Sequence, residues 1–218
     1  MSVVGEASLV LGIISSIISI IDAAKQVYEA VEDEAGLPTN FKKSAAKLPL
    51  ILKLLDDAER YIKTADKSAE LAFTPTLKDC KVQATHLQDL FKKVMPKEGD
   101  SRRDRYVKAA RTIGQGGRVE SLTKEILDDL QLLATKFPEV TTPRGKEQLA
   151  KAIGEVSKME PSLPDGFEQM PTNAHYGSGA QNINTGGTQN NNNISGSQNT
   201  GPGQQYIGTN NIGTPSKS

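Results

Sequence analysis

Residues 9–31 read LVLGIISSIISIIDAAKQVYEAV, and this stretch decides how the chain folds. Apolar residues recur at steps of three and four in two adjacent rows, which is the spacing of an α-helix that is apolar over most of its circumference. The β-branched isoleucines also suit a strand, but the length and the spacing favour a helix that packing must hold. We predict this helix from about Glu6 to Glu34. A narrow strip of small or polar residues interrupts the apolar rows: Gly12, Ser15, Ser19, Asp22 and Gln26.

Two roles fit this helix. Between Val3 and Ile21 there are 19 residues with Glu6 as the only charge, and such a helix is about 28 Å long, close to the thickness of a hydrocarbon core. One interpretation is a buried central helix of a soluble bundle. The other is a membrane-engaging helix that the resting domain covers and activation releases. Its contact residues are Leu9, Ile13, Ile14, Ile17, Ile18 and Ile21.

Start and stop signals divide the chain that follows into further helices. Gly36, Leu37 and Pro38 stop the first helix, and Thr39 or Asn40 caps the next. The spacing predicts the remaining helices at about 39–65, where Pro49 kinks or splits the helix, 74–96, 101–113, 119–135, and from Thr142 onward. The fold class is therefore all-α, a bundle of five to six helices over residues 1–160. A linker with Pro161, Pro164 and Gly166 follows over 161–175.

The composition changes sharply after this linker. The chain has 26 Lys and Arg and 26 Asp and Glu, for a net charge of zero. All of them except Lys217 precede Pro171. The remaining tail is rich in Gly, Asn and Gln and has few large apolar residues, so as a monomer it cannot offset its own chain entropy. We predict that it is disordered until it meets a partner.

The tail contains a degenerate repeat in which Gln-Asn recurs after eight and nine residues. Glycines separate the units, so each unit fits one short strand followed by a bend. Stacked copies would place Asn on Asn and Gln on Gln at about 4.8 Å, with every backbone group paired. The alternative is a flexible tail without function. The residues of this predicted amyloid motif, within 176–213, are Gln181, Asn182, Ile183, Gln189, Asn190, Ile194, Gln198, Asn199, Gln205, Tyr206 and Ile207.

The sequence offers no arrangement typical of an enzyme, a metal site or a cofactor site. The two histidines are far apart, and Cys80 has no evident base partner, so we assign Cys80 to packing. The glycines of 114–118 lack the Lys-Ser/Thr pair of a phosphate-binding loop and fit a turn between helices. Neighbouring aspartates, Asp56 with Asp57 and Asp128 with Asp129, diverge around their helices and suit solvent. We predict no catalytic residues, no metal and no cofactor.

The segment 101–113 is basic. Three-residue steps place four cations on one broad helical face, which fits contact with anionic lipid headgroups or a solvated face partly paired with acidic neighbours. Those cations are Arg102, Arg105, Lys108 and Arg111. The balanced overall charge gives no general attraction to nucleic acid, and we exclude nucleic acid as a partner. A single cysteine and an N-terminus without a basic start favour the cytoplasm.

Taken together, these residues resemble a known family. The matching pattern runs over about 5–140: Gly36-Leu37-Pro38 with Phe41, Leu48-Pro49-Leu50, Cys80, Leu87, Leu90-Phe91, Val94-Met95-Pro96, Arg105-Tyr106, Gly114-Gln115-Gly116, Val119-Glu120, Ile126-Leu127 and Leu130. It resembles the HeLo-like family, in particular the fungal SesA-type N-terminal domain found on NACHT and other P-loop receptors. The tail, with Tyr176-Gly177-Ser178-Gly179 and the Gln-Asn units, is similar to the sigma-type amyloid signalling motif.

The resemblance implies an effector of fungal programmed cell death and non-self recognition. In such systems a NACHT or NB-ARC-type receptor with a similar motif templates the effector's tail into an amyloid fold, and the helical domain then engages or permeabilises membrane. The implied partners are other copies of the chain, that receptor and the plasma membrane, to which the protein relocates on activation. A different class also fits: a non-enzymatic adaptor that recruits a helical partner and uses the tail as a tether.

Overall fold

The computed structural model describes residues 4–30, 37–94, 101–114 and 116–169. Within these residues the chain forms seven α-helices and one short 3-10 helix, and no strand, which confirms the all-α prediction. The tail after Gln169, with all its predicted amyloid residues, lies outside the described residues. The helices are α1 (Val4–Glu29), α2 (Thr39–Ala45), α3 (Leu48–Ile62), α4 (Lys67–Lys93), α5 (Arg102–Ile113), α6 (Val119–Lys136), α7 (Pro143–Ser157) and the 3-10 helix η1 (Phe167–Gln169).

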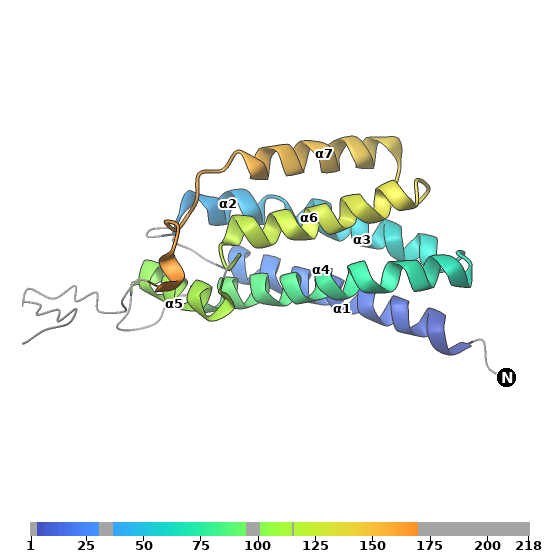
Figure 1. Cartoon of the computed structure of the whole chain (residues 1–218), viewed down its shortest axis with the longest axis horizontal. Helices are drawn as coiled ribbons and strands as arrows, with labels where there is room; N and C mark the ends of the chain where they lie inside the picture. The colour runs from blue at the N-terminus through green and yellow to red at the C-terminus, as the bar shows by residue number, and fades with distance from the viewer. Residues whose placement is uncertain (1–3, 31–36, 95–100, 115, 170–218) are drawn as a thin grey trace, which may run out of the picture. The chain divides into compact units, whose positions relative to one another are not determined.

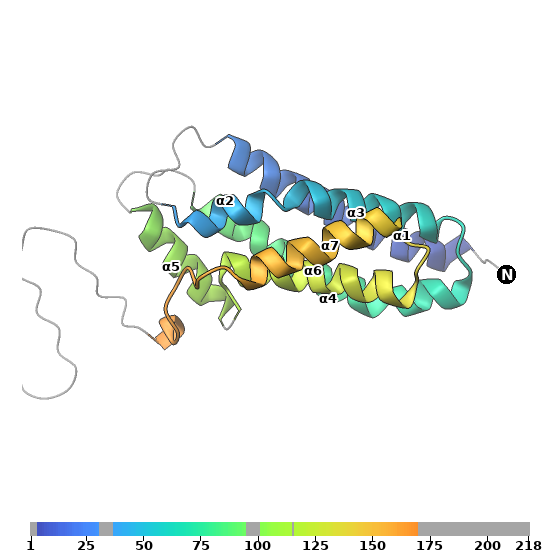
Figure 2. The same cartoon turned by 90° about the horizontal axis from the view of Figure 1, so that it is seen from above.

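The long helices of the bundle run along one common direction. Figure 1 shows α7, α6, α4 and α1 stacked in that order, and Figure 2, turned by 90°, shows α3 running beside them. Helix α1 packs mainly against α4 and α3, and α4 in turn packs against α6. The short helices α2 and α5 lie together at one end of the bundle, away from the N-terminus of α1 (Figure 2).

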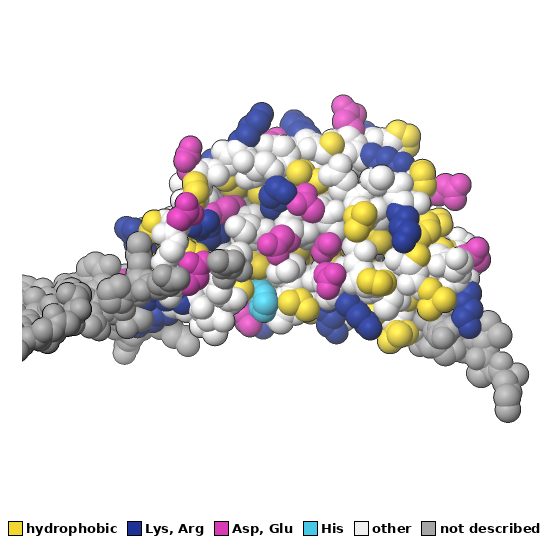
Figure 3. All heavy atoms as spheres, viewed as in Figure 1, with side chains coloured by type: hydrophobic (Ala, Val, Ile, Leu, Met, Phe, Trp, Pro, Cys, Tyr) yellow, Lys and Arg dark blue, Asp and Glu magenta, His cyan; other side chains and the backbone are white. Residues whose placement is uncertain are grey.

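The core forms where apolar stripes of these helices meet. On α1 the buried residues Ile14, Ile17, Ile21 and Ala24 are spaced by three or four, so they share one face of the helix. At the end near α2 and α5, four aromatic rings pack edge to face: Phe41 contacts Phe91 and Tyr106, and Phe91 contacts Tyr28, with ring centroids 4.8 to 5.8 Å apart. Both signs of charge are interspersed on the face seen in Figure 3.

Pro49 marks a helix boundary and Pro75 does not. The predicted helix over 39–65 is split into α2 and α3, because Pro49 stands in the first turn of α3, where its missing N–H costs nothing. The predicted start of the next helix at Thr74 is wrong. Helix α4 begins at Lys67, since the Asp66 side chain caps it by accepting from the Ala69 N–H at 2.8 Å. Pro75 therefore lies inside α4, with its ring exposed to solvent.

The predicted helix starts at residues 101 and 142 are confirmed, and each is the N-cap residue of its helix. The Ser101 hydroxyl accepts from the Asp104 N–H at 3.1 Å and starts α5, and the Thr142 hydroxyl accepts from the Gly145 N–H at 3.1 Å and starts α7. Helix α1 is described to Glu29, so its predicted end at Glu34 lies outside the described residues.

The burial of α1 predicts the effect of shortening one side chain. Ile17→Ala removes a fully buried side chain from the contact of α1 with the bundle. We expect the free energy of unfolding to fall by about 2–4 kcal/mol, from lost burial and the cavity left behind. Ser15→Ala, on the exposed side of α1, is the matched control and should change it by less than about 0.5 kcal/mol. Urea unfolding measures both, and equal effects would contradict the packing described.

Candidate functional site

The membrane-engaging residues predicted on α1 are mostly inside the bundle. Ile14, Ile17 and Ile21 are fully buried and Ile13 is 9% exposed, whereas Ile18 is half-buried and Leu9 is 55% exposed. Gly12, Ser15 and Ser19 face solvent, so the small and polar strip is the side of α1 that the bundle leaves uncovered. In this state the helix offers water its least apolar side, and Ile14, Ile17 and Ile21 have no access to a lipid surface.

The same helix has the dimensions of a membrane span. Among the described residues, Leu9–Glu29 is the one helical segment long and apolar enough to cross a bilayer, with 21 residues and a mean hydropathy of 1.6. Core helices of soluble proteins also meet this criterion. In the resting bundle Ile14, Ile17 and Ile21 are buried in the core. If α1 is uncovered, its length and composition are sufficient to cross a bilayer.

The basic helix α5 does not present its four predicted cations as one free face. Arg111 donates from Nε to the carbonyl oxygen of Phe167 at 2.9 Å, and thereby holds the C-terminal segment. Arg102 and Arg105 are half-buried and Lys108 is exposed, and each of these three has its own polar or electrostatic partner. The predicted headgroup face is thus largely engaged within the protein.

The segment that follows α7 forms a strap across the bundle, which we define as residues 158–169. Figure 1 shows it leaving α7 and reaching α5, where η1 packs. Leu163 and Phe167 are 3% and 2% exposed, so the strap belongs to the core. The predicted linker from 161 is therefore wrong up to Gln169, because these two apolar side chains anchor a segment whose prolines and glycine suggested a linker.

A partly buried polar network fastens the strap to the start of α6. The Tyr106 hydroxyl contacts the Ser162 hydroxyl at 2.5 Å and accepts from the Val119 N–H at 3.1 Å. The Ser162 N–H donates to Glu120 Oε1 at 2.8 Å, and Glu120 is itself buried. Burial raises the pKa of Tyr106 to about 12, and the hydrogen bonds from Ser162 and Val119 oppose that rise. The phenol is therefore neutral at physiological pH.

Charged and aromatic contacts hold the end of the strap. The Arg118 guanidinium pairs with Asp165 at 2.7 Å and lies over the Phe167 ring, 5.4 Å from its centroid. Asn40 of α2 donates to the Glu160 carbonyl at 2.8 Å. The strap thus contacts α2, α5 and the beginning of α6. The sequence marked Tyr106, Val119 and Glu120 as part of a family pattern, Arg111 as a headgroup contact and Asn40 as a helix cap, and none of them as a partner of this segment.

A family model matches most of the helices described above. Residues 14–133 match the family model of SesA, described as the N-terminal domain on NACHT NTPases and P-loop NTPases. This match covers more than half of the chain. The chain belongs to the SesA family. No curated protein and no solved structure matches it.

The SesA match begins within α1 and ends within α6. It includes the buried isoleucines of α1, the basic helix α5 and the two residues of α6 that hold the strap, Val119 and Glu120. Helix α7 and the strap follow the matched residues. The resemblance predicted from the sequence is thus confirmed for the helical domain, while the sigma-type motif of the tail stays a prediction.

Cys80 and the two glycines between α5 and α6 have the structural roles that the sequence predicted. Cys80 is fully buried and burial raises the pKa of its thiol, so the side chain is a protonated packing residue, as predicted. Gly114 and Gly116 have φ of 87° and 85°, which fits the predicted turn between helices α5 and α6. Among the described residues no group of three or more His, Cys, Asp or Glu is arranged to hold a metal.

An acidic cluster lies where α6 faces α4. The pKa of Asp129 is raised from 3.8 to about 6, first by burial and then by the charges of Asp79, Glu125 and Asp128. The interpretation of Asp129 as a plainly solvated residue is therefore wrong, since the side chain is half-buried among like charges. The protonated form is favoured in the folded state relative to the unfolded chain.

The raised pKa of Asp129 predicts a pH dependence of stability. The pKa of Asp129 is higher in the folded state than in the unfolded chain. The contribution of the protonated carboxyl to the free energy of unfolding is therefore complete below about pH 3.8 and is lost as the pH rises through about 6. After allowance for solvent screening, we expect a loss of about 1 kcal/mol between pH 4 and 7. Asp129→Asn should remove that loss in urea unfolding at the two pH values. If this variant loses as much stability between pH 4 and 7 as the parental protein, the assignment to Asp129 is contradicted.

The strap network predicts the effect of removing one hydroxyl. Tyr106→Phe leaves Ser162 and the Val119 N–H without their partner in a buried site. We expect a loss of about 1–3 kcal/mol in the free energy of unfolding and faster amide exchange at Ser162. Tyr61→Phe, on the other end of the bundle, is the control and should change the free energy by less than about 0.5 kcal/mol. Similar values for the two variants would rule out the network as an anchor of the strap.

Proposed function

We propose that this SesA protein is a non-enzymatic effector of fungal cell death in non-self recognition, activated through its tail. The observation that carries the proposal is the joining of a SesA bundle to an uncharged Gln/Asn-rich repeat in one chain. The association of SesA domains with NACHT NTPases supports a signalling role and a receptor of that type as partner. We place the resting protein in the cytoplasm.

The first step of the proposed mechanism is templating of the tail. A NACHT or NB-ARC-type receptor that has assembled presents a similar motif in stacked form. The units around Gln181, Gln189, Gln198 and Gln205 then add to this stack, one chain on the next, with amide ladders along the stack. The tail carries only Lys217, so charge repulsion along the stack is small.

The second step is exposure of α1 to a membrane. Support comes from its length and hydropathy and from its position in the bundle, where its isoleucines are covered by α3 and α4. Activation uncovers Ile13, Ile14, Ile17, Ile18 and Ile21 beside the already exposed Leu9, and the helix then enters or permeabilises the plasma membrane. Of the four cations predicted to contact headgroups, Lys108 of α5 is the exposed one and adds such a contact.

The second candidate function is an adaptor. The full burial of Ile14, Ile17 and Ile21 favours it, because a bundle that never opens has no membrane face on α1. In that case the bundle recruits a helical partner and the tail tethers it to the assembly. Neither candidate uses catalysis, and we propose that the chain has no enzymatic activity, cofactor or nucleic-acid partner.

Seeded liposome leakage distinguishes the two functions. Fresh full-length protein is mixed with dye-loaded vesicles of phosphatidylcholine and phosphatidylserine, and sonicated fibrils of the same chain are added. The effector proposal predicts dye release only when both fresh protein and seeds are present. The adaptor proposal predicts that fibrils form on seeding and that the vesicles release no dye.

A charge placed in the tail provides the matched test of templating. Gln189→Lys puts like charges about 4.8 Å apart in a stack of copies and should reduce seeded release to the unseeded level. Ser216→Lys adds the same charge outside the motif and should release dye at the parental rate. Equal release by both variants would overturn templating through the Gln-Asn units, and no release by any protein that forms fibrils would overturn the membrane step.

A further inference from the structure

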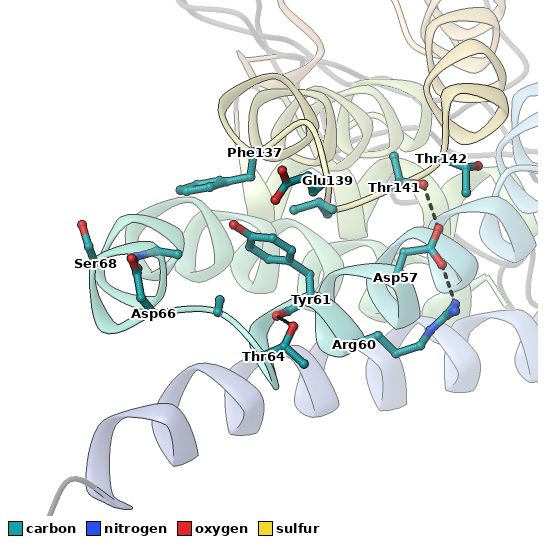
Figure 4. A pocket seen from close by; sticks show the side chains of 13 residues that line it. Asp57, Arg60, Tyr61, Thr64, Asp66, Ser68, Phe137, Glu139, Thr141 and Thr142 are labelled. Atoms are coloured by element: carbon teal, nitrogen blue, oxygen red, sulfur yellow. Dashed lines mark hydrogen bonds and ion pairs between the residues drawn. The ribbon is translucent and has the colours of Figure 1, made fainter.

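An open cleft lies at the end of the bundle opposite α5. Its volume is about 820 Å³, and its walls come from the end of α3, the start of α4 and the connection between α6 and α7. Figure 4 shows Tyr61 and Asp57 of α3 on one side and Phe137, Glu139 and Thr141 on the other. Nothing in the proposed function uses this cleft.

Aromatic rings form part of the cleft wall. Tyr61 and Phe137 are half-buried, and their ring centroids are 5.9 Å apart. Both rest on Phe73, which is fully buried, at centroid distances of 5.8 Å for Tyr61 and 4.7 Å for Phe137. The two lining rings are therefore held in place from behind and are partly exposed, and the Lys136 ammonium already lies over the Phe137 ring, 5.8 Å from its centroid.

The charges that line the cleft are mainly acidic. They are Asp57, Asp66 and Glu139, with Arg60 as the only base of the lining. Asp57 and Arg60 cancel each other, since Asp57 Oδ1 lies 2.5 Å from the Arg60 guanidinium. The Thr141 hydroxyl donates to the other oxygen of Asp57 at 2.7 Å, so this carboxylate has a partner at each oxygen. Asp66 and Glu139 are exposed carboxylates beside the rings, and Asp66 uses Oδ1 to cap α4, which leaves its other oxygen for a ligand.

This combination of aromatic rings and carboxylates suits one kind of group. A guanidinium is flat, so it stacks on a ring, and its fork of N–H donors pairs with a carboxylate at the same time. The carboxylates of Asp66 and Glu139 would repel an anion. A purely apolar group would desolvate these carboxylates without offering them a hydrogen-bond donor. A lysine ammonium pairs with an acid but cannot stack as a plane.

We propose that the cleft binds an arginine side chain carried by an exposed segment of a partner protein. Charge complementarity with Asp66 and Glu139 supplies attraction, and the face of Tyr61 turned away from Phe73 supplies the stacking surface. The cleft is open to solvent at the bundle end, so a side chain on a folded or extended segment reaches it without any opening of the domain. Arginine is also among the residues enriched at the energetic centres of protein interfaces.

The test is a titration of isotope-labelled full-length protein with the peptide acetyl-Gly-Arg-Arg-Gly-amide, followed by NMR. The proposal predicts saturable shifts of the Tyr61 and Phe137 ring signals. Glu139→Gln should raise the Kd of the peptide about threefold or more, as for loss of an exposed ion pair that is also hydrogen-bonded. Glu139 is exposed, so this variant should keep the parental melting temperature. Glu147→Gln, an exposed glutamate of α7 away from the cleft, is the matched control and should leave the Kd unchanged.

Four outcomes would overturn the proposal. The first is the absence of saturable ring shifts, and the second is equal affinity of the parental protein and the Glu139→Gln variant. The third concerns another occupant: if Glu139→Lys alters the concentration dependence of sedimentation of the chain without peptide, the cleft holds a second copy. Weaker shifts with the lysine analogue acetyl-Gly-Lys-Lys-Gly-amide are expected, and equal or stronger shifts would contradict the choice of arginine.

Discussion

Helix α1 carries two rows of isoleucine, leucine and valine that water solvates poorly, and the arrangement of the bundle follows from the need to cover them. Helices α3 and α4 provide that cover, and α6 and α7 are layered beyond them. Each fully buried isoleucine contributes about 1.5–3 kcal/mol relative to an exposed one. What stays in water is the strip with Gly12, Ser15 and Ser19. The constraint that stabilises the resting domain is thus the one that must be broken if α1 is to meet a membrane.

The strap connects this bundle to the residues that precede the tail. It crosses from α7 to α5. Four residues of α5 and of the start of α6 hold it: Tyr106, Arg111, Arg118 and Glu120. The described chain therefore ends in the packed strap, at a position where the sequence predicted a linker from residue 161. This explains why part of the basic helix is unavailable as a lipid-binding face: Arg111 is used to hold the backbone of the strap.

Local patterns in the sequence predicted the helices well, because spacing, caps and proline act over a few residues. The caps at Ser101 and Thr142 and the break at Pro49 are examples. The start of α4 was missed because Asp66 caps it and the exposed Pro75 is tolerated within it. The strap was missed because only two apolar side chains, Leu163 and Phe167, distinguish it from a linker. The cleft depends on three segments that meet only after folding, so no local pattern could assemble Tyr61, Asp66 and Glu139.

The central claim is that assembly of the tail uncovers α1, and hydrogen–deuterium exchange in the full chain tests it most directly. Amides of residues 10–27 are followed before and after seeding with fibrils of the same chain, with α6 as the internal reference and fibre diffraction as proof of conversion. The account predicts that α1 loses protection on seeding and regains it when anionic vesicles are present, while α6 changes little. Unchanged protection of α1 in protein that has converted to cross-β fibrils would contradict it.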